Sequence, residues 1–151
     1  MSRLRDAERA MGQVAETLRR RAAAGIVSPN FVFAPSIAST RNVISGAPFD
    51  DGADNPVWAD FQRKVGALET DQATKDRLLT DGRAALTGEW RRGYEGVLTA
   101  LAEVQQQANA MPDRDGGVWR LPQGEALYNA RLQLSTTTDL TADQIHQTGL
   151  D

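Results

Sequence analysis

The sequence has no cysteine and a single histidine, His146. Without cysteine the chain can form no disulfide, no thiol nucleophile and no thiolate metal site. One histidine cannot build a zinc site that uses two or three histidines, and it leaves only one base for a histidine-dependent triad. We therefore predict no catalytic residue, no metal ligand and no cofactor in this chain.

Long hydrophobic runs and an excess of positive charge are also missing. The N-terminus lacks the apolar stretch of a signal peptide, and no segment is long enough to span a membrane. Seventeen basic residues stand against twenty acidic ones, a net charge of −3, whereas nucleic-acid binding needs a basic surface. We expect a cytoplasmic protein that binds neither a membrane nor nucleic acid.

The rest of the composition is typical of one folded domain. The chain has 151 residues, 40% of them hydrophobic, which is enough to bury a core. Apolar residues recur every three or four positions over most of it, as in amphipathic helices. We predict a single helical region over 1–151, with turn-rich loops at 46–56 and 113–124. The predicted fold is mostly α, an irregular domain of five or six helices, with a short strand near 134–138 as an alternative to a helix end.

Capping and helix-breaking residues set the expected boundaries. Pro35 is expected to delay the second helix until Ser36, because proline breaks a helix interior. The apolar periodicity of residues 70–109 predicts one long helix of about 40 residues. The other expected boundaries are the stop at Gly25, the cap and first turn at Asn55 and Pro56, and the capping box of Thr141 and Gln144.

Carboxylate pairs are the remaining candidates for acid–base chemistry. Asp50 and Asp51 lie in one polar loop, and Asp113 and Asp115 lie in another. Paired carboxylates do acid–base work when burial separates their pKa values. Solvation in these loops keeps both members ionised, so we interpret the pairs as loop residues.

The segment from Gly117 to Leu150 carries the densest motif, GVWRLPQGEALYNARLQLSTTTDLTADQIHQTGL. It is similar to the pattern G-V-W-x-L-P-x-G-E-x-Y-Y followed by T-T-T-D-L-T-P-E-E-I-H-x-L-G-L. The matching residues are Gly117, Val118, Trp119, Leu121, Pro122, Gly124, Glu125 and Tyr128, then Thr136, Thr137, Thr138, Asp139, Leu140, Thr141, Ile145, His146, Gly149 and Leu150. On these residues the chain resembles a bacterial family, domain of unknown function 885.

The resemblance implies a larger helical fold like that of zinc metallopeptidases of the gluzincin type. Its members usually run to several hundred residues, with the zinc motif H-E-x-x-H well downstream of this segment. In that motif two histidines on one helix face hold zinc and the glutamate activates water. The resemblance therefore implies that this chain is an N-terminal-side portion, that zinc belongs to full-length relatives, and that those relatives can be exported.

The leading functional hypothesis is a non-catalytic portion of a metallopeptidase-like protein, with the remainder of the parent protein as its partner. The residues expected to serve a substrate cleft, or else a purely structural turn and cap, are Trp119, Gly124, Glu125, Tyr128, Thr136, Thr137, Thr138 and His146. The alternative is an independent helical protein-interaction module, such as a homodimer that uses the long 70–109 helix. A third hypothesis is a metal-independent hydrolase, which requires Glu125 and His146 within hydrogen-bond reach.

Overall fold

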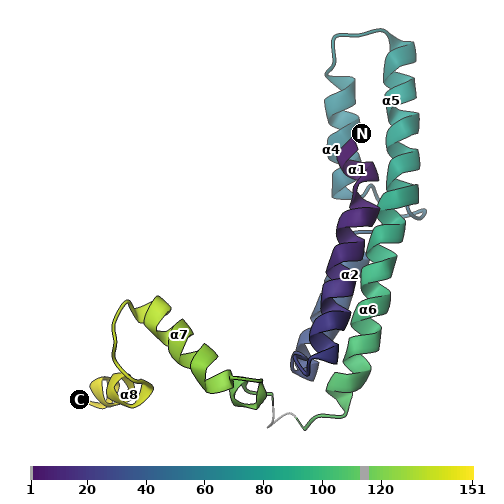
Figure 1. The fold of residues 1–151 in the computed structure, drawn as a ribbon. Coiled ribbons are helices and arrows are strands. Elements are labelled where there is room, and N and C mark those ends of the chain that lie inside the picture. Colours follow the sequence, from purple (N-terminus) through teal and green to yellow (C-terminus); the bar gives the residue numbers. More distant parts are fainter. Residues whose placement is uncertain (1, 113–115) are drawn as a thin grey trace.

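The computed structural model describes residues 2–112 and 116–151, and these are largely helical (Figure 1). With the continuous rod α5–η2–α6 taken as one helix, the described residues form six helices longer than a single turn and no strand. The mostly α fold is therefore confirmed. The first part of the loop predicted at 113–124, with Asp113 and Asp115, lies outside the described residues. The elements are α1 (Ser2–Arg5), α2 (Ala7–Ala23), η1 (Asn30–Val32), α3 (Phe33–Asn42), α4 (Pro56–Gly66), α5 (Gln72–Ala85), η2 (Leu86–Trp90), α6 (Arg91–Asn109), η4 (Val118–Arg120), α7 (Gly124–Thr136) and α8 (Ala142–Leu150).

Helix α2 ends as predicted, at a glycine in the left-handed region. Gly25 has φ +77°. Its N–H donates to the carbonyl of Ala22 at 2.9 Å, and the N–H of Ile26 donates to the carbonyl of Arg21 at 2.9 Å. This Schellman arrangement satisfies carbonyls at the helix end and turns the chain into the loop at 26–29.

Helix α3 begins earlier than predicted. It starts at Phe33, so Pro35 lies inside the first turn instead of before the helix. A first-turn N–H has no acceptor within its own helix, so proline removes no hydrogen bond there. Ser36, the predicted first residue, instead donates its hydroxyl to the carbonyl of Val32 at 2.7 Å. Phe33 is buried in the core, and this packing supports the earlier start.

Asn55 is buried and organises the loop predicted at 46–56. Its side-chain carbonyl accepts the N–H of Val57 at 3.0 Å and so caps α4, which begins at Pro56 as predicted. Its side-chain amide donates to the carbonyl of Ser45 at 2.9 Å and to that of Val43 at 3.3 Å. One side chain thus ties the end of α3 to the start of α4.

The long helix predicted over 70–109 is present as the rod α5–η2–α6 (Figure 1). Asp71 caps it by accepting the N–H of Thr74 at 2.8 Å. The rod is interrupted at Gly88, where φ −95° and ψ −106° leave the helical region within the π-helical segment η2. Leu86 in the same segment is fully buried, so the interruption coincides with a core contact.

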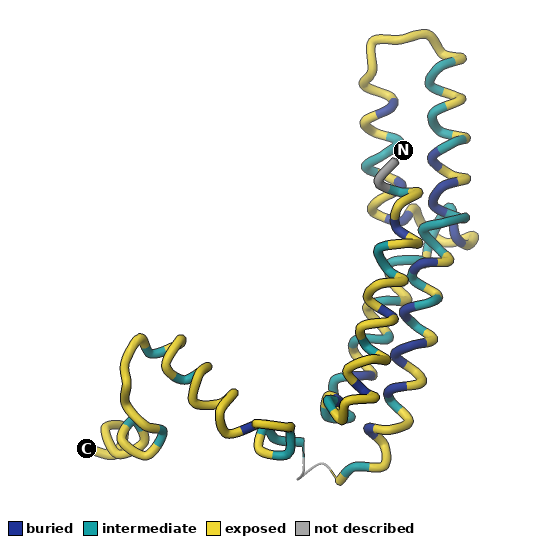
Figure 2. The backbone as a smooth tube through the Cα atoms, in the orientation of Figure 1, coloured by how far each residue is buried: buried dark blue, intermediate teal, exposed yellow. Residues whose placement is uncertain are grey.

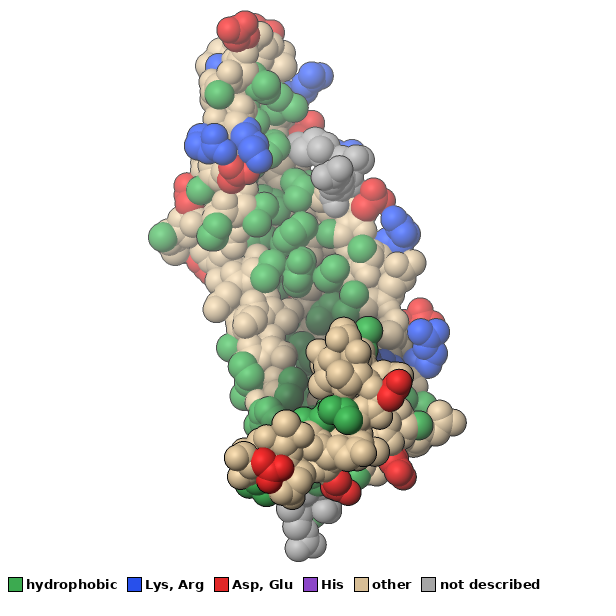
Figure 3. Space-filling view, turned by 90° about the vertical axis from the view of Figure 1, so that its left-hand side faces the viewer, with side chains coloured by type: hydrophobic (Ala, Val, Ile, Leu, Met, Phe, Trp, Pro, Cys, Tyr) green, Lys and Arg blue, Asp and Glu red, His purple; other side chains and the backbone are tan. Residues whose placement is uncertain are grey.

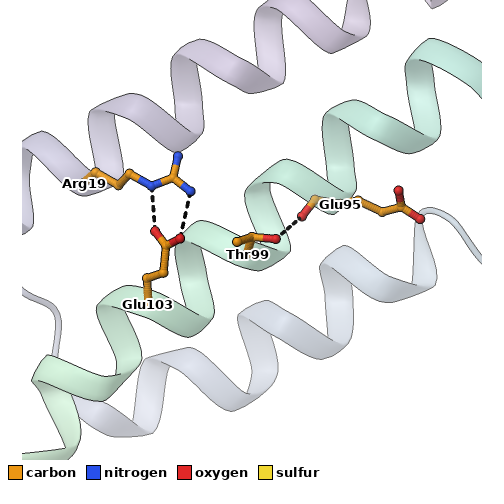
Figure 4. A network of polar contacts seen from close by, with 4 residues as sticks. All are labelled: Arg19, Glu95, Thr99 and Glu103. Carbon is orange, nitrogen blue, oxygen red and sulfur yellow. Dashed lines mark hydrogen bonds and ion pairs between the residues drawn. The ribbon is translucent and has the colours of Figure 1, made fainter.

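Helices α2 and α6 run side by side in the same direction (Figure 1). Glu8 pairs with Arg92 at 2.9 Å, and Arg19 pairs with Glu103 at 2.6 Å (Figure 4). Both pairs join residues 84 positions apart in the sequence. The register between the two helices therefore stays constant over residues 8–19 and 92–103, about three helical turns.

Two apolar clusters form the core, and buried positions follow the inner side of the rod (Figure 2). The cluster between α2, α3 and α6 is rich in alanine, which lets the helices approach closely. Its buried members are Ala15, Ala22, Val27, Phe33, Val97, Ala100, Leu101, Val104 and Ala108. The second cluster, where α4 meets the rod, has Phe49, Trp58 and Leu86 as its buried members.

Helices α7 and α8 project away from this bundle and are exposed over most of their length (Figures 1 and 2). Helix α7 continues through Thr136, so the alternative of a short strand near 134–138 is wrong. The helix satisfies its own backbone groups, whereas a strand here would have no described strand to pair with. Helix α8 begins at the predicted capping box, in which the Thr141 hydroxyl accepts the N–H of Gln144 at 3.3 Å and the Gln144 side chain accepts the N–H of Thr141 at 2.8 Å.

None of the helices described has the length and apolar character needed to cross a membrane.

Candidate functional site

The motif segment folds into a short 3₁₀ turn, η4, that leads directly into α7. Gln123 adopts the left-handed region at φ +59°, and the N–H of Gly124 donates to the carbonyl of Leu121 at 2.8 Å. A Cβ at Gly124 would collide with the backbone carbonyl of Val118. Glycine is therefore required for η4 to pack across the first turn of α7.

Trp119 is held at the surface by a second glycine. Its side chain is 71% exposed. The six-membered ring of the indole lies against Gly117, where a Cβ would overlap the ring. Tryptophan is highly buried on average and is enriched where proteins bind partners. The two glycines of the motif thus present an exposed indole in a defined position.

Four of the predicted site residues meet in one open hollow of about 490 Å³. Trp119 contributes from η4, while Gly124, Glu125 and Tyr128 contribute from the first turns of α7. Glu125 and Tyr128 are three residues apart, so they share a face of the helix. The lining is mainly apolar, and Glu125 is the one charged side chain that the described residues contribute to it. We call this site the Trp119 hollow.

The three threonines of the motif lie outside the Trp119 hollow, in the turn between α7 and α8. The hydroxyl of Thr136 donates to the carbonyl of Leu132 at 2.9 Å and lies 3.0 Å from the hydroxyl of Thr138. Thr137 ends α7 with φ +56°, and its N–H donates to the carbonyl of Gln133 at 2.8 Å. Thr138 also lines a second open hollow of about 370 Å³ beside this turn. These hydrogen bonds favour a structural role for the threonines.

His146 is exposed on α8, beyond the turn that follows α7. Within the described residues no hydrogen bond or ion pair joins it to Glu125, which lies in the first turn of α7. The structure therefore does not bring together the pair that a metal-independent hydrolase would need.

Arg120 is a residue that the sequence did not single out. Its guanidinium donates to the carbonyl of Val27, 93 positions away in the loop that follows α2. A hollow of about 230 Å³ lies at this contact, with Arg21 and Arg120 among its lining residues. Arg120 thus ties the motif segment to the bundle. Only a three-dimensional structure can reveal a partner so distant in sequence.

Shifted pKa values in the bundle mark surface ion pairs. Hydrogen bonds from Lys64 and then Arg63 lower the pKa of Asp60, and the Arg19 guanidinium lowers the pKa of Glu103. Asp60 pairs with cations of its own helix α4, whereas Glu103 of α6 pairs with Arg19 of α2. Because these carboxylates stay ionised beside cations, they are not suited to acid–base chemistry.

The described side chains do not form a metal site. Across 2–112 and 116–151 no three histidine, cysteine, aspartate or glutamate side chains come together in a way that could hold a metal ion. The described residues therefore do not fit the zinc site that the resemblance implies for full-length relatives, and we derive no step through zinc.

Apolar side chains are also exposed outside the Trp119 hollow. Figure 3 shows hydrophobic side chains gathered along the middle of one face of the molecule, with charged groups mostly towards its margins. On α7, α8 and the turn between them, the exposed large apolar residues are Leu127, Tyr128, Leu134, Leu140 and Leu150. Large contiguous patches of apolar surface mark sites of interaction, whereas single exposed apolar residues are common on protein surfaces.

The model of a protein family described as "Bacterial protein of unknown function (DUF885)" matches residues 1–151. Comparison with curated proteins and with solved structures gave no match.

Proposed function

This chain belongs to the DUF885 family, and we propose that it is a non-catalytic helical portion of a metallopeptidase-like protein, in which the Trp119 hollow binds peptide. Zinc and peptide hydrolysis belong, in this proposal, to the part of full-length relatives that carries H-E-x-x-H. The metallopeptidase-like part of this proposal rests on the resemblance of the segment Gly117 to Leu150 to the family motif.

One observation carries the peptide-binding element: Trp119, Glu125 and Tyr128 of the motif line the same open hollow. Trp119 and Tyr128 are 71% and 46% exposed, so both rings are available to a ligand. Exposed aromatic rings give large contact areas with little loss of side-chain entropy, and they are frequent in surfaces that bind peptides.

The test uses the 151-residue chain and a panel of short peptides with blocked ends. We expect binding that shifts the indole N–H resonance of Trp119 in NMR spectra of the parent. Isothermal titration calorimetry, which does not depend on that resonance, should show that Trp119→Ala abolishes binding. Leu68→Ala is the matched control, because Leu68 is an exposed apolar residue outside the motif segment, and it should leave binding unchanged. If no peptide binds, or if Trp119→Ala binds as well as the parent, the peptide-binding element is wrong.

Two further measurements test the proposal that this chain is non-catalytic. Mass spectrometry of the same peptides after incubation with the chain should show them intact. Metal analysis of the purified chain should give far less than one zinc per chain. One zinc per chain together with peptide cleavage would overturn the proposal.

The alternative function is self-association as an interaction module. The apolar side of α6 packs against α2 and α3 within the chain, so the exposed apolar residues of α7 and α8 are the surface that favours this alternative. Sedimentation equilibrium discriminates: a stable dimer that Leu134→Glu dissociates would support self-association, and a monomer at all concentrations would refute it. Leu134 is 70% exposed, so this substitution should not disturb folding.

A further inference from the structure

The Trp119 hollow combines two aromatic rings with one carboxylate. Trp119 lines it from η4, and Glu125 and Tyr128 line it from α7. We propose that this hollow selects a positively charged side chain, lysine or arginine, in an extended peptide. This inference rests on the proposed peptide binding and adds the chemical class of residue that the site prefers.

The charge of the lining favours a cation. Among the described residues that line the hollow, Glu125 is the only charged one. Arg120, the basic residue next to Trp119 in the sequence, donates to the carbonyl of Val27 and lines a different hollow. Ion pairs found within the described residues involve other carboxylates, so Glu125 has no described cation as its partner.

The aromatic rings favour the same ligand. The π face of tryptophan, and less strongly that of tyrosine, attracts a cation within about 6 Å of the ring centre. An arginine guanidinium can stack on an indole and hydrogen-bond to a carboxylate at the same time. At an exposed site the contact with the aromatic ring and the contact with the carboxylate each favour a cationic side chain over a neutral one a few-fold. Together they favour it about tenfold.

The local backbone keeps these groups together. Gly117 allows the indole to lie against the chain, and Gly124 allows η4 to approach the first turn of α7. Glu125 also lies in that first turn, so its carboxylate lines the same hollow as both rings.

The experiment compares blocked pentapeptides, acetyl-Ala-Ala-Xaa-Ala-Ala-amide, that differ only in the central residue. Arginine is compared with citrulline, its neutral analogue of nearly equal shape, and lysine is compared with norleucine. Dissociation constants come from titration of the Trp119 indole N–H resonance, which is assigned by its loss in Trp119→Phe. We expect arginine to bind about tenfold more tightly than citrulline at low salt, and this ratio to fall as salt is added.

Two variants locate the origin of the preference. Glu125→Gln should reduce the arginine-to-citrulline ratio several-fold while leaving the affinity for the citrulline peptide unchanged. Glu69→Gln removes an exposed charge from the loop between α4 and α5, outside the hollow, and should leave the ratio as it is.

The outcomes separate the two proposals. Equal affinity for arginine and citrulline overturns the cation preference but leaves peptide binding intact. A preference that Glu125→Gln does not reduce also overturns it. Failure of every peptide to shift the Trp119 resonance overturns peptide binding itself.

Discussion

A methyl group added at either of two glycines of α6, Gly93 or Gly96, should change the free energy of unfolding by different amounts. A Cβ at Gly93 would lie 3.0 Å from the carbonyl oxygen of Ala7 and 3.0 Å from the Cα of Glu8, whereas a Cβ at Gly96 would have nothing within 4 Å. Both glycines lie within the same helix, so alanine gains about 0.8–1.0 kcal/mol in helix propensity at either site. The comparison therefore isolates the contact between α2 and α6.

The magnitude follows from the approach of the two backbones. Non-bonded carbon atoms are most stable about 3.5–4.0 Å apart. At Gly93 the obstructing atoms belong to the backbone of α2, so the added methyl group must push the helices apart, and overpacking of this kind costs about 1–3 kcal/mol. Gly96→Ala should stabilise the chain by about 1 kcal/mol, and Gly93→Ala should be about 1–3 kcal/mol less stable than Gly96→Ala.

Urea unfolding followed by far-UV circular dichroism measures the difference, provided that the slope of the transition is the same for both variants. NMR gives a second readout, because the Arg19–Glu103 pair depends on the register between α2 and α6. The resonances of Arg19 and Glu103 should shift in Gly93→Ala and not in Gly96→Ala. Equal stabilisation by the two substitutions would refute the close packing of the helices at this point.

Two other substitutions test the second core cluster and the loop that leads to α4. Leu86→Ala removes a fully buried side chain and should cost about 2–5 kcal/mol, whereas Leu68→Ala, at a side chain that is 46% exposed, should cost about 0.5 kcal/mol or less by the same urea assay. Backbone hydrogen bonds from Gly52 and then Gly46 lower the pKa of Asp50 below 3.8, so its contribution to stability is present above that pH and is lost as the pH falls through the folded pKa. Asp50→Asn should therefore be less stable than the parent at pH 7, and the difference should shrink on acidification below about pH 4 in thermal unfolding; a constant difference would contradict the assignment.

Helix ends that depend on neighbouring residues were predictable from the sequence. The stop at Gly25, the cap at Asn55 and the capping box at Thr141 each act through hydrogen bonds that span a few residues. Pro35 misled the prediction because its effect depends on where the helix starts. That start is fixed by the burial of Phe33 against residues far away in the sequence, which no local rule contains.

Contacts between elements distant in the sequence could not be predicted from the sequence. The constant register of α2 and α6 depends on pairs 84 positions apart, and the bond from Arg120 to Val27 spans 93 positions. Alternation of apolar residues shows which side of a helix is buried but does not identify the helix that covers it. For that reason α6 could be considered as a dimer surface, whereas within the chain its apolar side packs against α2 and α3.

The candidate site was partly predictable because it is local. The described lining residues of the Trp119 hollow all come from 118–128, and all five match the motif that carries the resemblance. Four of them were predicted as site residues: Trp119, Gly124, Glu125 and Tyr128. The motif did not show that its threonines lie apart from the hollow. Helix α7 separates the two, and the residues that flank this helix, Gln123 and Thr137, both adopt the left-handed region. A long, gap-free motif therefore supplies two structures here, a hollow at the start of α7 and a hydrogen-bonded turn at its end. Only the hollow leaves aromatic rings and a carboxylate free to meet a ligand.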